Sequence, residues 1–237
     1  MLIQKWLHVS EFGGNYWVTP VWGAIKHAEE KGCCSGITAE LRELGINVST
    51  RFAMLPRIIQ RINSGWDELF KNIQNFSDDN VFERGIDKRS YAIQVDADLI
   101  YPLLLDIDSF LFETNSCSEL LGLFLHLTYL QIGKESNEKK IGLELKKILS
   151  QHGNDISWFQ LLDKERNLLI HKVAPYIAID ISSSVPDLII MKENLHSFDD
   201  PNKFILLSEL NKIVSGFSEA IMILQEHIIK LYISTSC

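Results

Sequence analysis

The sequence has few basic residues for its length, and this shortage limits how the protein could bind nucleic acid. Lysine and arginine together number 23, against 31 aspartate and glutamate residues in a chain of 237, which gives a formal net charge of −8. Proteins that hold duplex nucleic acid across a broad surface use an excess of Lys and Arg to neutralise phosphates. The composition excludes such a surface and leaves room only for a small local basic site.

The cysteine and aspartate residues do not occur at the spacings that metal sites need. The four cysteines lack the CxxC spacing of a zinc site and do not suggest a disulfide framework; they are Cys33, Cys34, Cys117 and Cys237. Asp96 and Asp98, like Asp106 and Asp108, form carboxylate pairs, but residues two apart on a helix point in nearly opposite directions. We therefore expect reduced thiols, no metal ion and no other cofactor.

Long apolar runs are missing as well. The first residues, MLIQKWLHVSEFGG, are too polar for a secretory signal, and no apolar run reaches the ~18 residues that a membrane span needs. Glycine and proline are few, while 46% of residues are hydrophobic, which is enough for a large core and argues against disorder. We expect a cytoplasmic protein that makes no contact with a membrane.

Apolar residues recur at steps of three and four along most of the chain, which predicts an all-α helical bundle. The first clear stripe predicts a helix that begins at Pro56 and runs to about residue 76. Further helices are expected at about 92–113, 118–132, 138–152, 157–174 and 202–232. Residues 176–192, YIAIDISSSVPDLIIMK, alternate and are rich in β-branched side chains, so they predict a small β-hairpin between the last two helices.

The N-terminal part is less regular. Residues 12–23, FGGNYWVTPVWG, set four aromatic residues among turn signals and predict a hairpin or a folded arm. A short helix is expected at 37–45, with Thr38 as its N-cap and Gly45 as its stop. The break at 77–90 marks a boundary between an N-terminal extension, residues 1–89, and a helical domain, residues 90–237. The tryptophans of the arm either cover part of the bundle or stack on RNA.

One stretch, DKERNLLIHKVAP at 163–175, combines a helical pattern with an unusual polar set. At ~100° per residue, Arg166, Asn167 and His171 fall on the arc opposite the leucine-rich core stripe. Asn167 and His171 are four residues apart and are therefore helical neighbours. The same outer arc carries three apolar residues, which are Phe159, Ile170 and Ala174. A mixed arc of this kind is typical of a surface that a second protomer or another protein covers.

Glu165 does not fit this division into two faces. It falls on the core arc, and the residues three and four positions to either side are all leucine. Because it has no ion-pair partner on its own helix, it must reach either another helix or the solvent.

The residues RNLLIH resemble the Arg-polar-x-x-x-His signature of the HEPN superfamily. The resemblance covers roughly residues 90–237, through the order of the helices and this motif, and does not extend to residues 1–89. It implies an α-helical bundle, a homodimer in which two motifs meet at the interface, and a metal-independent endoribonuclease. It also implies a toxin-like or defence-related role in which a partner protein restrains the enzyme.

The side chains of the motif suit that chemistry. RNA is cleaved when its 2′-OH attacks the adjacent phosphorus, which requires a base, an acid and a cation. His171 serves as acid or base because its ordinary pKa is ~6.5. Arg166 stabilises charge on the phosphorane oxygens, and Asn167 orients the imidazole or holds a phosphate oxygen. Two flanking lysines, Lys164 and Lys172, are expected to bind the RNA.

Two other interpretations remain open. In the first, Arg166 and His171 are ordinary solvated residues of a surface helix. In the second, the chain is a non-catalytic helical module that binds a protein partner or a nucleotide through the same outer arc. An enzyme loses activity on His171→Ala but still dimerises, whereas a docking module loses association.

Overall fold

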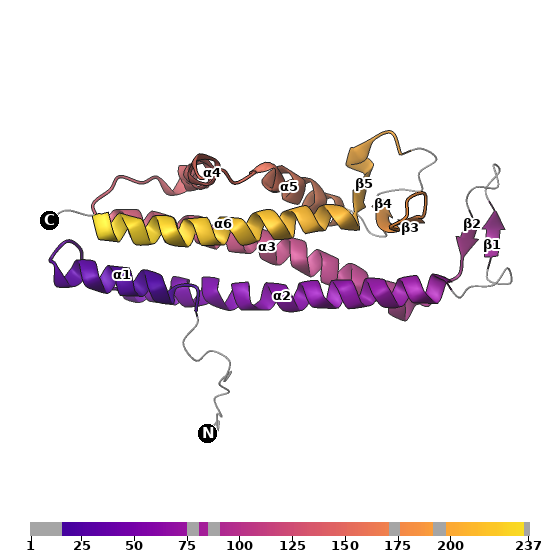
Figure 1. The fold of residues 1–237 in the computed structure, drawn as a ribbon, viewed down its shortest axis with the longest axis horizontal. Coiled ribbons are helices and arrows are strands. Elements are labelled where there is room, and N and C mark those ends of the chain that lie inside the picture. Colours follow the sequence, from indigo (N-terminus) through magenta and orange to yellow (C-terminus); the bar gives the residue numbers. More distant parts are fainter. Residues whose placement is uncertain (1–15, 75–80, 85–90, 171–175, 192–197, 235–237) are drawn as a thin grey trace, which may run out of the picture. The chain divides into compact units, whose positions relative to one another are not determined.

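The computed structural model describes residues 16–74, 81–84, 91–170, 176–191 and 198–234, and of these it describes 81–84, 91–93 and 167–170 by their backbone alone. Within this part the chain is mostly helical, with six α-helices, α1 to α6, and two small antiparallel sheets (Figure 1). The predicted mostly helical architecture, with a small β element between the last two helices, is confirmed. None of the described helices has the length and hydropathy needed to cross a bilayer.

The first helix lies where an irregular arm was expected. α1 spans Thr19–Glu30, so the prediction of a hairpin or folded arm over 12–23 is wrong from Thr19 onward. Pro20 sits in the first turn of α1, where its missing N–H costs nothing and its fixed φ suits a helix. The proline therefore begins a helix here and does not mark a turn. Residues 12–15 lie outside the described part of the chain.

The second helix, α2, spans Ala39–Gln74 without interruption. Thr38 is its N-cap, as predicted, because the backbone N–H of Leu41 donates to the Thr38 hydroxyl at 3.2 Å. The predicted stop at Gly45 is wrong. A Cβ on that residue would lie 2.8 Å from Cγ2 of Val18, so the glycine is needed for close packing and not for a turn.

The predicted helix start at Pro56 is also wrong, since Pro56 lies inside α2. A proline in a helix interior has no N–H to donate to the carbonyl four residues earlier, which here belongs to Phe52. The helix nevertheless continues to Gln74. One residue after the proline, the guanidinium of Arg57 donates to the carbonyl oxygen of Ala53 at 2.5 Å.

The next elements are a hairpin and a long helix. β1, Val81–Arg84, pairs antiparallel with β2, Tyr91–Ile93. α3 spans Ala97–Gln131 and joins the two helices expected at 92–113 and 118–132. The polar residues between them do not break it, because the hydroxyl of Thr114 donates to the carbonyl of Phe110 at 2.8 Å within the helix.

The C-terminal half follows the prediction more closely. The 3₁₀ turn η3, Glu138–Lys140, leads into α4, Ile141–Gln151, and α5 spans Ser157–Ile170. The predicted hairpin is present as β3, Tyr176–Asp180, and β4, Asp187–Met191, with Ala178 paired to Ile189. A third strand, β5, Phe204–Leu206, extends this sheet after η4, Pro201–Lys203, and α6 spans Leu207–Ser234.

The chain divides into two compact units, and the long helices contribute residues to both. Unit 1 comprises residues 1–52, 117–154 and 218–237, and unit 2 comprises residues 53–116 and 155–217. The predicted division into an extension, 1–89, and a helical domain, 90–237, stays a prediction.

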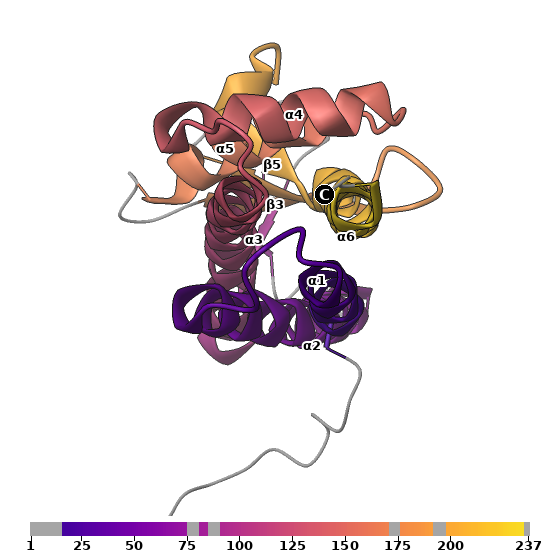
Figure 2. The same cartoon turned by 90° about the vertical axis from the view of Figure 1, so that its left-hand side faces the viewer.

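Unit 1 is built around aromatic packing. Trp17 makes edge-on contacts with Phe52 and Phe124, at centroid distances of 5.4 and 5.7 Å, and its indole N–H donates to the carbonyl of Ile221 at 2.8 Å. This tryptophan therefore covers the helices, as one of the two interpretations of the arm proposed. In the same unit α4 lies across α6 and not along it (Figures 1 and 2).

The cysteines differ from expectation at one position. Cys33 is disulfide-bonded, whereas Cys34 and Cys117 are free thiols. The expectation of reduced cysteines is therefore wrong for Cys33. Burial raises the pKa of the Cys34 thiol, and the nearby carboxylate of Glu29 raises it further.

Candidate functional site

Helix α5 of unit 2 carries the Arg-Asn-x-x-x-His stretch, and it begins at a turn made by Asp155. The carboxylate of Asp155 accepts hydrogen bonds from the backbone N–H of Ser157 at 2.9 Å and from its hydroxyl at 2.8 Å. Those two bonds hold the pKa of Asp155 below its usual range. Ser157 is the first helical residue, and Asp155 organises the turn before it.

The buried face of α5 is anchored by Trp158 and Leu162, which are 2% and 1% exposed. The indole of Trp158 lies edge-on to Phe217 of α6, at 5.8 Å between ring centroids. It also covers Gly216, where a Cβ atom would overlap the indole ring. Absence of a side chain at Gly216 thus allows α5 to dock closely on α6.

Phe159 is buried, although the helical wheel places it on the outer arc. It is only 9% exposed and stacks on Trp158 with 3.7 Å between centroids. The chain itself buries this aromatic residue, so Phe159 gives no reason to expect a partner on that arc. The other two apolar residues of the arc, Ile170 and Ala174, have no described side chain.

Glu165 is the most unusual group in the described part of α5. Its side chain is 0% exposed, and neither carboxylate oxygen has a hydrogen-bond partner. Burial raises the pKa of Glu165 to about 8, the negative charge of Glu209 adds to this effect, and Lys164 and Lys212 oppose it. The residue reaches neither the solvent nor a partner on another helix, contrary to expectation. At neutral pH it is a buried neutral acid.

Lys164 lies one residue earlier and is already engaged. Its ammonium group is 3.5 Å from the carboxylate of Glu209 on α6, and both side chains are about four-fifths buried, with 21% and 19% exposed. The same carboxylate accepts a long hydrogen bond from the backbone N–H of Leu206 at 3.4 Å. Nothing in these contacts tests the predicted RNA-binding role of Lys164, which stays a prediction.

Arg166 differs from Lys164 because it has no acidic partner. Its Nε atom is buried and has no hydrogen-bond partner, and no ion pair joins its guanidinium to a carboxylate among the described residues. A half-buried guanidinium without a counter-ion is costly unless a ligand or another chain supplies an anion. Arg166 is thus the described residue best suited to bind an anionic group.

The rest of the predicted site lies beyond what the structure describes. Asn167 belongs to α5 by its backbone, but its side chain is not described. His171 and Lys172 lie outside the described residues. The structure therefore brings Arg166 and Glu165 together on one turn, and the predicted grouping of Arg166 with Asn167 and His171 is not tested.

One carboxylate of each aspartate pair at or near α3 has a structural partner. Asp96 accepts from the backbone N–H of Asp98 at 2.9 Å at the start of α3, and Asp106 accepts from Nε of Arg61 on α2 at 2.9 Å. Among the described residues, no group of three or more His, Cys, Asp and Glu side chains is arranged to hold a metal ion.

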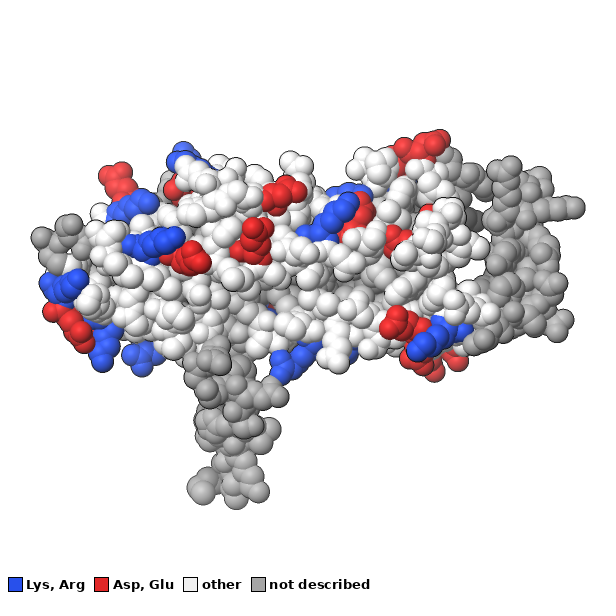
Figure 3. All heavy atoms as spheres, viewed as in Figure 1, with Lys and Arg blue, Asp and Glu red and all other residues white. Residues whose placement is uncertain are grey.

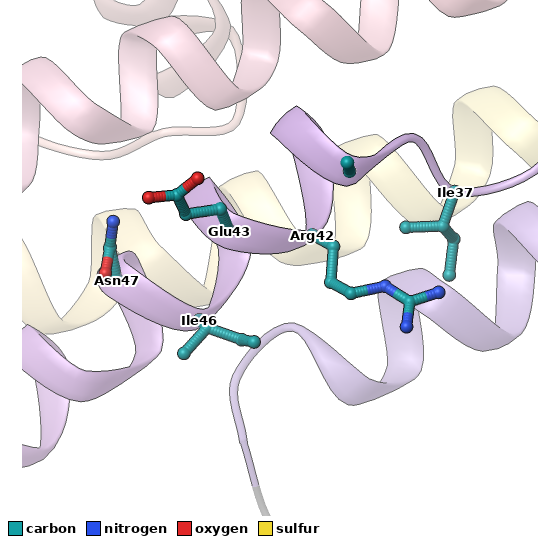
Figure 4. Close-up of a pocket in the computed structure, with 6 residues that line it drawn as sticks. Ile37, Arg42, Glu43, Ile46 and Asn47 are labelled. Atoms are coloured by element: carbon teal, nitrogen blue, oxygen red, sulfur yellow. The ribbon is translucent and has the colours of Figure 1, made fainter.

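Two hollows lie away from α5. The described residues that line the first, of about 460 Å³, all lie between Ile37 and Asn47, and Figure 4 shows Arg42 extending toward Ile37 while Glu43 points elsewhere. The second, of about 320 Å³, is mostly apolar and lies in unit 2 between α2, α6 and the turn after β3, with Trp66 and Asn211 among its lining residues.

The sequence did not predict that Glu165 is buried without a partner, although its position among leucines points to burial. An acidic residue flanked by leucine at both three and four positions to either side lies on a face that must be buried. What the pattern could not show is that the opposing helix offers Glu209, a second acid, in place of a basic partner.

Comparisons with known proteins give no further assignment: no family model, no curated protein and no solved structure matches this chain.

Proposed function

We propose that this protein is a metal-independent endoribonuclease that cleaves RNA by attack of the 2′-OH on the adjacent phosphorus. Its reactive groups are Arg166, Asn167 and His171, and Lys164 and Lys172 help to hold the RNA. The proposal includes a homodimer with a composite site and a toxin-like or defence-related role under the control of a partner protein.

The observation that carries the proposal is the unpaired guanidinium of Arg166. The chain has a net charge of −8, and two of its cations, Lys164 and Arg61, have acidic partners. Arg166 has none among the described residues, and its Nε is buried. A planar cation that keeps its donors free is suited to a phosphate group, whose oxygens it binds in a bidentate manner.

Glu165, the residue directly before Arg166, does not add a negative charge at physiological pH. Burial raises its pKa to about 8, and the nearby negative charge of Glu209 contributes to this rise.

The roles of the motif residues follow from their chemistry. One His171 accepts the proton of the 2′-OH, and the second His171 of a homodimer donates a proton to the leaving 5′-oxygen. Arg166 stabilises the charge that develops on the equatorial phosphorane oxygens. Asn167, four residues before His171, orients the imidazole through a hydrogen bond. The reaction leaves a 2′,3′-cyclic phosphate on one product.

A composite site also accounts for how an acidic protein holds RNA. On the face that Figure 3 shows, basic and acidic side chains are interspersed and form no large basic patch. Binding therefore depends on a few cations at one place. Two protomers that juxtapose their motifs gather two arginines and two histidines, which is enough to contact one or two phosphates.

The test is cleavage of a structured RNA in the presence of EDTA by the wild-type protein and by Arg166→Ala and His171→Ala variants. We expect cleavage by the wild type and losses of about 10²–10⁴-fold in the variants. Matched controls are His27→Ala, an exposed histidine of α1, and Arg61→Ala, an exposed arginine that pairs with Asp106. Both controls should retain full activity.

A second function, a non-catalytic interaction module, is favoured by an exposed apolar stripe on α3. Tyr101, Leu105 and Phe112 are 64%, 65% and 55% exposed, and their spacing of four and seven residues places them on one face. Such stripes commonly contact another protein. If no RNA is cleaved, and Leu105→Glu but not Arg166→Ala abolishes self-association, the module is the better description.

A further inference from the structure

A group of titratable side chains in unit 1, separate from α5, has no role in the proposed ribonuclease. It comprises Tyr129 at the end of α3, Lys134 in the following loop, His152 at the end of α4, and His227 on α6. The two histidines lie 75 positions apart in the sequence, and only the fold brings them together.

The four side chains form a connected cluster around the buried ring of Tyr129, which is 2% exposed. Its hydroxyl lies 3.2 Å from Nε2 of His227. The ring of His152 meets the ring of His227 edge-on, at 6.0 Å between centroids. The ammonium of Lys134 lies over the Tyr129 ring, 3.7 Å from its centroid.

The hydrogen bonds fix the tautomer of His152. Its Nδ1 lies 2.9 Å from the carbonyl oxygen of Ile148 and must donate to it, which leaves Nε2 with a lone pair. Burial raises the pKa of Tyr129 to about 12, so its hydroxyl keeps its proton and shares a hydrogen bond with Nε2 of His227. When the ring of His227 is charged, its Nδ1 carries a proton and is free to donate.

The cluster has an excess of groups that bind anions. Lys134 has no ion pair with any described carboxylate, and neither Nδ1 of His227 nor Nε2 of His152 has a hydrogen-bond partner among the described residues. The negative charge of Glu144 acts on both Tyr129 and His227, but this carboxylate lies 3.9 Å from the ammonium of Lys147 and shares its charge with that residue.

We propose that Lys134, His152 and His227 form a binding site for a terminal phosphate group. Three donors on three different elements suit the three free oxygens of a phosphate monoester better than the two coplanar oxygens of a carboxylate. Lys134 supplies a permanent charge, His227 donates from Nδ1, and His152 takes up a proton on Nε2 to become the third donor.

The electrostatics of the cluster agree with this assignment. Burial lowers the pKa of His227, and the charges of Lys134, His152 and Lys230 lower it further, while Glu144 opposes them. A bound dianion reverses the sign of the local field and favours the charged imidazoles. Binding should therefore be accompanied by proton uptake near neutral pH.

The test follows the two imidazoles by NMR during pH titrations in chloride and in inorganic phosphate at equal ionic strength. We expect phosphate to raise the pKa of His227 by about 1 or more, and Lys134→Gln to abolish most of that rise. The matched control, Lys139→Gln, removes an exposed lysine of η3 and should leave it intact. Equal pKa values in chloride and phosphate, or a rise that survives Lys134→Gln, would overturn the proposal.

Two further ligands identify which kind of molecule carries the bound phosphate group. A DNA oligonucleotide with a 5′-phosphate is compared with the same oligonucleotide carrying a 5′-hydroxyl, and adenosine monophosphate is titrated separately. Tighter binding of the phosphorylated oligonucleotide than of the mononucleotide identifies a nucleic-acid end as the ligand, and the reverse identifies a free nucleotide. Both results support the site, whereas equal binding of the phosphorylated and hydroxylated oligonucleotides contradicts it. None of these readouts depends on RNA cleavage.

Discussion

At the scale of single residues, Glu165 is the buried acid directly before Arg166 in α5. Its carboxyl group is fully buried without a hydrogen-bond partner, beside a second acid, Glu209. A group of this kind keeps its proton in the folded protein and loses it on unfolding at neutral pH. The folded state therefore carries a penalty that depends on pH.

We predict that Glu165→Gln stabilises the protein at high pH. The pKa of Glu165 is 4.5 when unfolded and about 8 when folded, so between these values only the unfolded state is ionised. The wild type should therefore lose stability as the pH rises from 4.5 to 8 and show no further loss from this group above 8. Urea unfolding at pH 5.5 and pH 8.5 should show that the wild type loses about 2–4 kcal/mol more than the variant.

The control for this prediction is Glu68→Gln, which makes the same change at an exposed position of α2. It should leave the pH dependence of stability as it is in the wild type. An identical pH dependence in the wild type and Glu165→Gln would show that Glu165 ionises normally in the folded protein.

Arg166 is predicted to need its guanidinium and not only its charge. Arg166→Lys keeps the positive charge but replaces a planar, bidentate donor with a point charge. We expect kcat/KM for RNA cleavage to fall by about 10–100-fold, less than for Arg166→Ala. Equal activity of the lysine variant and the wild type would contradict a bidentate contact with phosphate.

At the scale of elements, the docking of α5 depends on one glycine. Gly216 of α6 lies under the indole of Trp158, and a Cβ there would overlap the ring. Gly216→Ala should therefore destabilise the protein by about 1–3 kcal/mol, because a packed core tolerates an added methyl group poorly. It should also lower cleavage activity, because α5 carries Arg166.

The matched control is Gly23→Ala in α1, where a Cβ would meet nothing within 4 Å. That change should stabilise the protein by about 0.5–1 kcal/mol, because alanine has the higher helix propensity. Thermal unfolding of both variants separates the general effect of glycine in a helix from the contact with Trp158. Equal effects of the two substitutions would contradict the role of Gly216 in docking.

The elements that the sequence predicts well are those whose signals are local. The pairing of β3 with β4 follows from alternation around a Ser and Pro turn, and the apolar spacing of α4 marks its buried face. Gly45 misled the prediction of α2 because its role depends on a contact with Val18 that no local pattern shows. Pro56 misled it because a proline is more common in the first turn of a helix than in its interior, where it lies here.

The candidate site was predictable to a similar extent. The motif and the burial of Glu165 follow from spacing on one helix. The unpaired state of Arg166 and the second acid beside Glu165 depend on which residues α6 places opposite α5. The cluster of Tyr129, His152 and His227 had no sequence signal at all, since its members come from three separate elements.

At the scale of the whole molecule, the proposed enzyme is a homodimer whose site needs residues from two chains. Arg166→Ala and His171→Ala chains should each be inactive alone. Mixed dimers should recover a measurable fraction of the activity, because each retains one arginine and one histidine at the shared site. Refolding the two variants together and separately checks this; no recovery in confirmed mixed dimers would contradict a composite site.

The most direct test of the central claim concerns the 2′-OH of the substrate. An RNA and the same sequence with 2′-methoxy groups are incubated with the protein in EDTA, and the product ends are identified by mass spectrometry. We predict cleavage of the unmodified RNA alone, with 2′,3′-cyclic phosphate and 5′-hydroxyl ends, and no cleavage by His171→Ala. Cleavage of the methoxy substrate, or products with 3′-hydroxyl and 5′-phosphate ends, would contradict the proposed mechanism.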